Sequence, residues 1–141
     1  MQLLSVSSAL SAVGAVALAV LILLAMITVH EFGHYAAGKI LGFKINEFAI
    51  GFGPALFKHT RKKSGEVFSV RAIPLGGYCA FEGEDEDSKL LPRRGSFNLM
   101  PPWKRIIVLV SGALMNYVTA VILIIITFLA FGQMVVRIDG V

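Results

Sequence analysis

The sequence is poor in the residues that stabilise or solvate an ordinary globular domain. Among 141 residues there is one cysteine, Cys79, and charged residues make up only 16%, against about 25% in soluble domains. A single cysteine excludes a disulfide within the chain. Residues 1–29 contain no charge at all. This disfavours a cleaved signal peptide, which begins with basic residues and carries a shorter apolar stretch of about 7–15 residues.

Two long apolar stretches account for the missing charge. They cover residues 9–29 and 106–131, and neither contains Asp, Glu, Lys or Arg. Each exceeds the ~20 residues needed to cross ~30 Å of hydrocarbon. The alternative is a pair of core helices, but a chain of this length has too little other sequence to bury both on all sides. We therefore predict two membrane-spanning helices.

The basic residues are concentrated between these two stretches. Of the 13 Lys and Arg, 12 lie between Lys39 and Arg105. The positive-inside rule then places the middle of the chain in the cytoplasm and both ends outside. A basic chain can also bind nucleic acid, but no basic helix or aromatic-basic pattern supports this. We expect a lipid bilayer as partner and no nucleic acid.

The predicted fold class is an α-helical membrane protein, in which two transmembrane helices flank a small membrane-associated antiparallel β-meander. Turn signals at Gly51–Pro54, residues 62–66 and Gly76–Gly77 separate about four short strands. The acidic run Glu82–Asp87 favours a solvated loop over a metal site. The predicted segments are transmembrane helix 1–41, cytoplasmic or interfacial meander and loop 42–105, transmembrane helix 106–132 and the start of an extracytoplasmic region, 133–141.

The first apolar stretch leads directly into the motif H-E-x-x-H, formed by His30, Glu31 and His34. On a helix, positions i and i+4 share one face, so both imidazoles can reach one metal ion. Glu31 is rotated by about 100° and can approach a metal-bound water without being a ligand. Zinc lowers the pKa of such a water towards ~7, and a carboxylate can take its proton. The alternative is a polar helix end outside the bilayer.

The depth and the ligand count of this site can also be estimated. A helix from Ala9 to His30 rises about 31 Å, which places the motif near the cytoplasmic boundary. A catalytic zinc normally has three protein ligands and a water. Positions 37 and 40, which would extend the motif in one class of zinc peptidase, are Ala37 and Ile40. Asp139 follows the second span and is predicted on the opposite side, so no third ligand is evident.

The second apolar stretch contains one amide, Asn116, on a face of small residues with Gly112 and Ala120. An amide in hydrocarbon usually finds a hydrogen-bond partner on another helix. Two roles remain open for Asn116. It can join the two helices, or it can contact the motif helix or a substrate backbone.

Four motifs in order resemble the site-2 protease family, most closely its bacterial regulator-of-sigma-E branch. They are "TVHEFGHYAAGK", "FAIGFGPALF", "VFSVRAIPLGGYCAFEGEDE" and "SFNLMPPWKRIIVLVSGALMNYVTA". The resemblance implies an intramembrane zinc metalloprotease of the bacterial inner membrane. Such enzymes cut single-span membrane proteins, such as anti-sigma factors or remnant signal peptides, in regulated intramembrane proteolysis.

The resemblance also implies roles for individual residues. His30 and His34 match the family's zinc ligands, and Glu31 matches its catalytic glutamate. Gly76 and Gly77 lie in the segment that matches a substrate-guiding β-sheet. With Asn116 they are the candidate substrate-binding residues.

The chain departs from the family pattern in two places. The family's A-G-P-x-x-N-F is here S-G-A-L-M-N-Y, Ser111–Tyr117, without the proline. The family takes its third ligand from an Asp on a later helix, beyond one or more PDZ domains, and this chain reaches Val141 where such a domain would begin. We therefore expect the N-terminal portion of a longer protease, inactive by itself. The alternative function is a non-catalytic membrane scaffold that binds client segments through a sheet edge.

Overall fold

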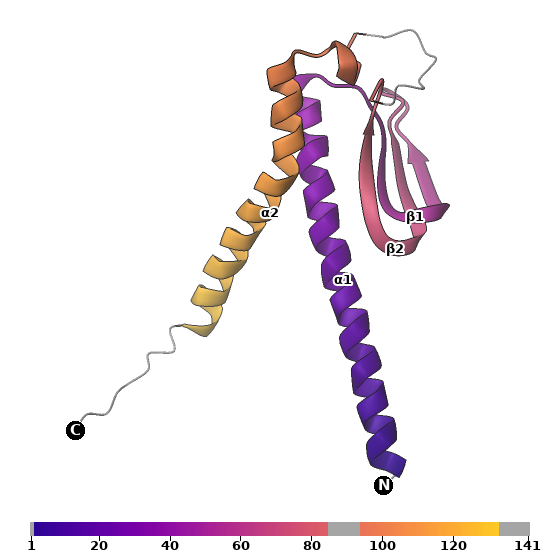
Figure 1. Cartoon of the computed structure of the whole chain (residues 1–141), viewed down its shortest axis with the longest axis vertical. Coiled ribbons are helices and arrows are strands. Elements are labelled where there is room, and N and C mark those ends of the chain that lie inside the picture. The colour runs from indigo at the N-terminus through magenta and orange to yellow at the C-terminus, as the bar shows by residue number, and fades with distance from the viewer. Residues whose placement is uncertain (1, 85–93, 133–141) are drawn as a thin grey trace, which may run out of the picture.

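The computed structural model describes residues 2–84 and 94–132. Two long helices pack together at one end and diverge towards the other, and a sheet lies beside the first helix (Figure 1). Residues 85–87 of the predicted acidic loop, Asp139 and the predicted extracytoplasmic segment 133–141 lie outside the described residues. The elements in chain order are α1 (Gln2–Leu41), β1 (Ile45–Thr60), β2 (Val67–Phe81), the short 3-10 helix η1 (Phe97–Leu99) and α2 (Pro102–Phe131).

Both helices are long and apolar enough to cross a membrane. Large apolar side chains point outward along them: Leu21 is 62% exposed and Ile124 is 67% exposed. In water such surface would be strongly unfavourable, whereas in lipid it needs no protein cover. Two apolar helices flanking an antiparallel sheet are the arrangement predicted from composition.

The helix ends follow local chemistry. Helix α1 ends at Leu41, and Gly42 then adopts a left-handed φ of 83°, as expected of a glycine just past a helix C-terminus. The ammonium of Lys104 donates to the Leu41 carbonyl oxygen at 3.0 Å and so satisfies one unpaired end group. Helix α2 begins at Pro102, whose missing N–H costs nothing in the first turn.

Helices α1 and α2 touch through two glycines. An ideal Cβ built on Gly33 would lie 2.4 Å from the Ser111 carbonyl oxygen and 2.9 Å from the Gly112 Cα. Only a residue without a side chain allows two helix backbones to approach this closely. The Gly33–Gly112 contact therefore sets the spacing of the two helices.

The sheet differs from the predicted meander of four strands. It has two long antiparallel strands, and both bend, so that residues 47–50 of β1 have β2 partners on each side. Ile50, for example, lies opposite both Gly77 and Val70. The expected turns at "GFGP" and "LGG" lie inside these strands. Gly51 and Gly53, with φ near 86° and 81°, bend the strand without ending its pairing.

A small aromatic core joins the sheet to the helix ends. Phe43, Ile45, Phe81 and Val108 are buried together, and Phe97 packs against them. The ring centroids of Phe43 and Phe81 are 5.7 Å apart, and those of Phe43 and Phe97 are 5.5 Å apart. Burying each such side chain stabilises the fold by about 1.5–3 kcal/mol. This core fixes the sheet beside α1.

Glu47 of β1 joins distant parts of the sheet. Its carboxylate accepts hydrogen bonds from Ser69 Oγ at 2.6 Å, Arg71 Nη2 at 2.8 Å and Tyr78 Oη at 2.9 Å. Burial acts to raise the pKa of Glu47, but these hydrogen bonds and the Arg71 charge together hold the pKa below its ordinary value. The charged form therefore stabilises the bent sheet.

Replacing Gly33 with Ala should loosen the helix pair. The new methyl group would collide with the α2 backbone, and overpacking of this kind costs about 1–3 kcal/mol. Alanine favours an isolated helix by ~1 kcal/mol over glycine, so a loss of stability must come from the contact. Thermal unfolding in detergent should show a lower midpoint. Gly14→Ala is the matched control, since nothing lies within 4 Å of that position; equal behaviour of both variants would contradict the contact.

Replacing Glu47 with Gln should loosen the sheet at neutral pH by about 1.5–3 kcal/mol, the contribution of a hydrogen bond to a charged group. A carboxyl with a lowered folded-state pKa stabilises above its unfolded pKa, and the effect is lost as the pH falls through the folded pKa. The difference from wild type should therefore shrink below pH ~4. Hydrogen exchange of β1 and β2 amides measures this difference in stability. A difference that does not change with pH would contradict the stabilising role of the charged Glu47 carboxylate.

Candidate metal centre

The three motif residues meet on the part of α1 that is packed by both α2 and the sheet. Potential ligand atoms of His30, Glu31 and His34 all lie within 4.8 Å of one another, and the three residues are partly buried. Across residues 2–84 and 94–132, no other group of three His, Cys, Asp or Glu side chains could hold a metal. The spacing of H-E-x-x-H thus produces the predicted cluster.

Each histidine turns one ring nitrogen towards α2. His34 Nδ1 lies 2.7 Å from the Val108 carbonyl oxygen, and His30 Nδ1 lies 3.4 Å from Asn116 Nδ2. The other nitrogens, Nε2 of both rings, converge on Gly112. A Cβ built on Gly112 would lie 2.5 Å from His34 Nε2 and 2.7 Å from His30 Nε2. The bare Cα of Gly112 therefore makes room for both imidazoles.

This arrangement fits a zinc ion. Neutral imidazole is a common zinc ligand, and a ligating histidine donates its other N–H to a carbonyl or carboxylate. Such a donor-acceptor pair is found at His34 and Val108. His30 and His34 would hold the metal through Nε2, and Glu31 lies beside them. A third protein ligand is not found within the described part of the chain.

Cys79 does not belong to the group of potential ligands formed by His30, Glu31 and His34. Burial, and next the negative charge of Glu31, raise the pKa of the Cys79 thiol to about 12. Cys79 packs against the aromatic core as a small apolar residue.

The sheet reaches the motif at Gly77. A Cβ built there would lie 3.6 Å from Glu31 Cγ and 2.8 Å from the Ala49 carbonyl oxygen. Strand β2 thus passes directly beside the glutamate. Gly76, by contrast, packs against the Phe52 ring. The two glycines belong to one bend, but only Gly77 borders the motif, and their role in substrate binding stays a prediction.

A hollow of about 340 Å³ opens beside the motif. One part of its wall is polar and comes from the motif and α2, and the rest is apolar and comes from α1. Its lining residues are Leu23, Met26, Ile27, His30, Glu31 and Asn116. His30 and Glu31 of the motif therefore border a space whose remaining wall is largely apolar.

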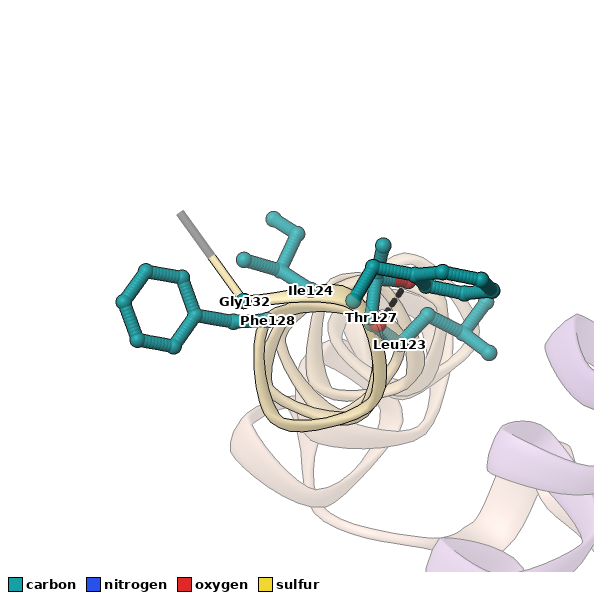
Figure 2. A pocket seen from close by; sticks show the side chains of 6 residues that line it. Leu123, Ile124, Thr127, Phe128 and Gly132 are labelled. Atoms are coloured by element: carbon teal, nitrogen blue, oxygen red, sulfur yellow. Dashed lines mark hydrogen bonds between the residues drawn. The ribbon is translucent and has the colours of Figure 1, made fainter. Parts of the chain in front are cut away.

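A larger hollow, of about 700 Å³, lies at the other end of α2, where its lining among the described residues comes from that helix and Gly132. Figure 2 shows its side chains fanning out around the helix, with Thr127 Oγ1 donating to the Leu123 carbonyl oxygen at 2.8 Å. Its other side chains are apolar, and none of its lining residues belongs to the motif. This surface carries no catalytic chemistry.

The sequence kept open a contact between Asn116 and the motif helix but did not indicate the contact between Val108 and His34. Val108, Gly112 and Asn116 recur at every fourth position and so share one helix face. The Gly112–Asn116 spacing was visible in the sequence. The carbonyl of Val108 was not, since every residue has one and only the packing selects it.

Comparison with known proteins places the chain in a family. The sequence profile of peptidase family M50 matches residues 18–138. A candidate zinc metalloprotease of Fusobacterium nucleatum is 39% identical over 110 residues, which is 78% of this chain and 31% of that protein. Another from Synechocystis is 40% identical over 124 residues, or 86% and 31%. A third, from Clostridium perfringens, is 42% identical over 102 residues, or 72% and 29%.

The chain spans about a third of the length of these curated relatives. Within that span, the matched region contains His30, Glu31 and His34, the sheet, and the parts of α1 and α2 that meet at the motif. The resemblance to site-2 proteases is thereby confirmed, and the chain belongs to peptidase family M50.

Proposed function

We propose that this chain supplies two zinc ligands and the general base of an intramembrane zinc metallopeptidase. One observation supports this most: Nε2 of His30 and of His34 converge over Gly112, with Glu31 in the same cluster. The names of the relatives, which are those of zinc metalloproteases, agree with zinc as the metal. The third ligand comes from sequence outside the described residues.

The role of each motif residue in peptide hydrolysis follows from its chemistry. Zinc at this site would polarise the scissile carbonyl and acidify a water molecule. His30 and His34 would hold the metal through their ring nitrogens. Glu31 accepts the proton of the attacking water and returns it to the nitrogen of the leaving amine. The apolar wall of the 340 Å³ hollow keeps bulk water away from this proton transfer.

The proposed substrates are single-span membrane proteins, with anti-sigma factors and remnant signal peptides as examples. A helical span hides its peptide groups in its own hydrogen bonds, so the bond to be cut must first become extended. Residues 77–81 of β2 pair with β1 and border Glu31 at Gly77. An unwound substrate can add to such an edge as a further strand. The reaction belongs at the cytoplasmic side of the bacterial inner membrane, with residues 42–105 in the cytoplasm.

The second candidate function is a non-catalytic scaffold that binds client segments through the same sheet edge. The described residues provide two histidine ligands and a glutamate, whereas a catalytic zinc normally has three protein ligands. Both functions use the sheet in the same way, and only the chemistry at Glu31 separates them.

Replacing Glu31 with Gln should lower cleavage of a model single-span substrate by about 10²-fold or more, since loss of a general base has effects of 10²–10⁴. Zinc content of the purified full-length protein should stay at that of wild type, because both histidines remain. Substrate cleavage in proteoliposomes and metal analysis measure the two quantities. Glu84→Gln is the matched control, as that carboxylate binds the Phe81 amide instead.

Removing both histidines separates the two candidate functions. His30→Ala combined with His34→Ala should abolish zinc binding and cleavage together. Under the scaffold function, the double variant would still capture the same substrate in a crosslinking assay, and wild-type protein would capture it without cutting it. Zinc-loaded wild-type protein that fails to cut any tested single-span protein would contradict the peptidase proposal.

A further inference from the structure

We infer that Asn116 is a positioning residue whose side-chain carbonyl accepts the Nδ1–H of His30 and thereby leaves His30 Nε2 free for the metal. This inference rests on the proposed zinc centre. It assigns to Asn116 a contact with His30, a proposed metal ligand, and not a contact with the substrate.

The hydrogen-bonding groups of Asn116 and His30 carry the argument. Asn116 Nδ2 lies 3.4 Å from His30 Nδ1, while Asn116 Oδ1 is buried and has no hydrogen-bond partner among the described residues. If the amide nitrogen donated here, His30 Nδ1 would have to be the bare acceptor. The ring proton would then sit on Nε2, the atom that must coordinate the metal.

A half-turn of the amide removes the tautomer conflict and turns the NH2 group, in place of the carbonyl, towards the side without a hydrogen-bond partner among the described residues. It exchanges the oxygen and nitrogen of Asn116 without changing the shape of the side chain. Oδ1 then faces His30 Nδ1–H, so the buried carbonyl gains its partner. The same hydrogen bond fixes the ring in the tautomer with a bare Nε2, which points at Gly112.

Val108 plays the corresponding role for His34. Its carbonyl oxygen lies 2.7 Å from His34 Nδ1 and fixes that ring in the same tautomer. Val108 and Asn116 lie one turn to either side of Gly112 on one face of α2. Helix α2 thus holds the outer nitrogen of each imidazole and leaves the inner nitrogens to converge.

The two acceptors differ in kind. Near Val108 the two helices are packed together, and the α2 backbone itself reaches His34. Further along α2 the helices separate (Figure 1). The contact with His30 is made by the side chain of Asn116 and not by a backbone carbonyl.

Zinc affinity of the full-length protein tests the inference. Asn116→Leu keeps the approximate volume but removes the acceptor, and Asn116→Ala removes it without risk of overpacking. Loss of such an outer partner lowers metal affinity by about 10–100-fold, and competition with a chromophoric chelator should show this for both variants. Asn116→Asp keeps an acceptor oxygen and should bind zinc at least as well as wild type. Thr119→Val is the control, because that hydroxyl donates to Met115 on its own helix.

The tautomer itself gives a readout that needs neither zinc nor activity. In metal-free protein, ¹⁵N-histidine NMR should show the His30 proton on Nδ1 in wild type and Asn116→Asp, and a mixture of tautomers in Asn116→Ala. Wild-type zinc affinity in Asn116→Leu and Asn116→Ala would overturn the inference, as would a raised KM with unchanged zinc affinity, the mark of a substrate contact. If wild type binds no zinc, the proposed function falls with it; if it binds zinc without cutting substrate, only the peptidase proposal falls.

Discussion

The contact between Gly33 and Gly112 is the constraint on which the rest of the structure depends. A Cβ on Gly33 would meet the α2 backbone, and a Cβ on Gly112 would meet both imidazoles. The two glycines therefore have different roles at the point where the helices cross. Gly33 allows the helices to approach, and Gly112 leaves the space that the ring nitrogens need. The geometry of the metal centre follows from backbone proximity more than from any single polar interaction.

The sheet also approaches the motif through a residue without a side chain. Gly77 passes beside Glu31 because it has no side chain, and the Glu47 cluster holds the surrounding bend with three hydrogen bonds. The cluster shares no residue with the motif, and its members all belong to the sheet.

Local sequence patterns were sufficient to predict the helices and the motif. Apolar length defines α1 and α2, and the i, i+4 spacing of His30 and His34 needs only a helix to become a ligand pair. The sheet was harder. The predicted turns at Gly51 and Gly76 were wrong, since both glycines lie inside strands. Whether a glycine ends a strand or bends it depends on partners far away in sequence. The acceptor at Val108 could not be predicted, because only tertiary packing selects one backbone carbonyl among many.

The hydrogen bond from Lys104 to the Leu41 carbonyl oxygen has a consequence for how such a protein can vary. It joins the last residue of α1 to the first turn of α2, so the intervening segment is a loop whose two ends are already held together. Doubling the length of a flexible loop with fixed ends costs only about 0.6 kcal/mol. The sequence between the helices can therefore lengthen or shorten in its exposed loops without changing where the two imidazoles meet.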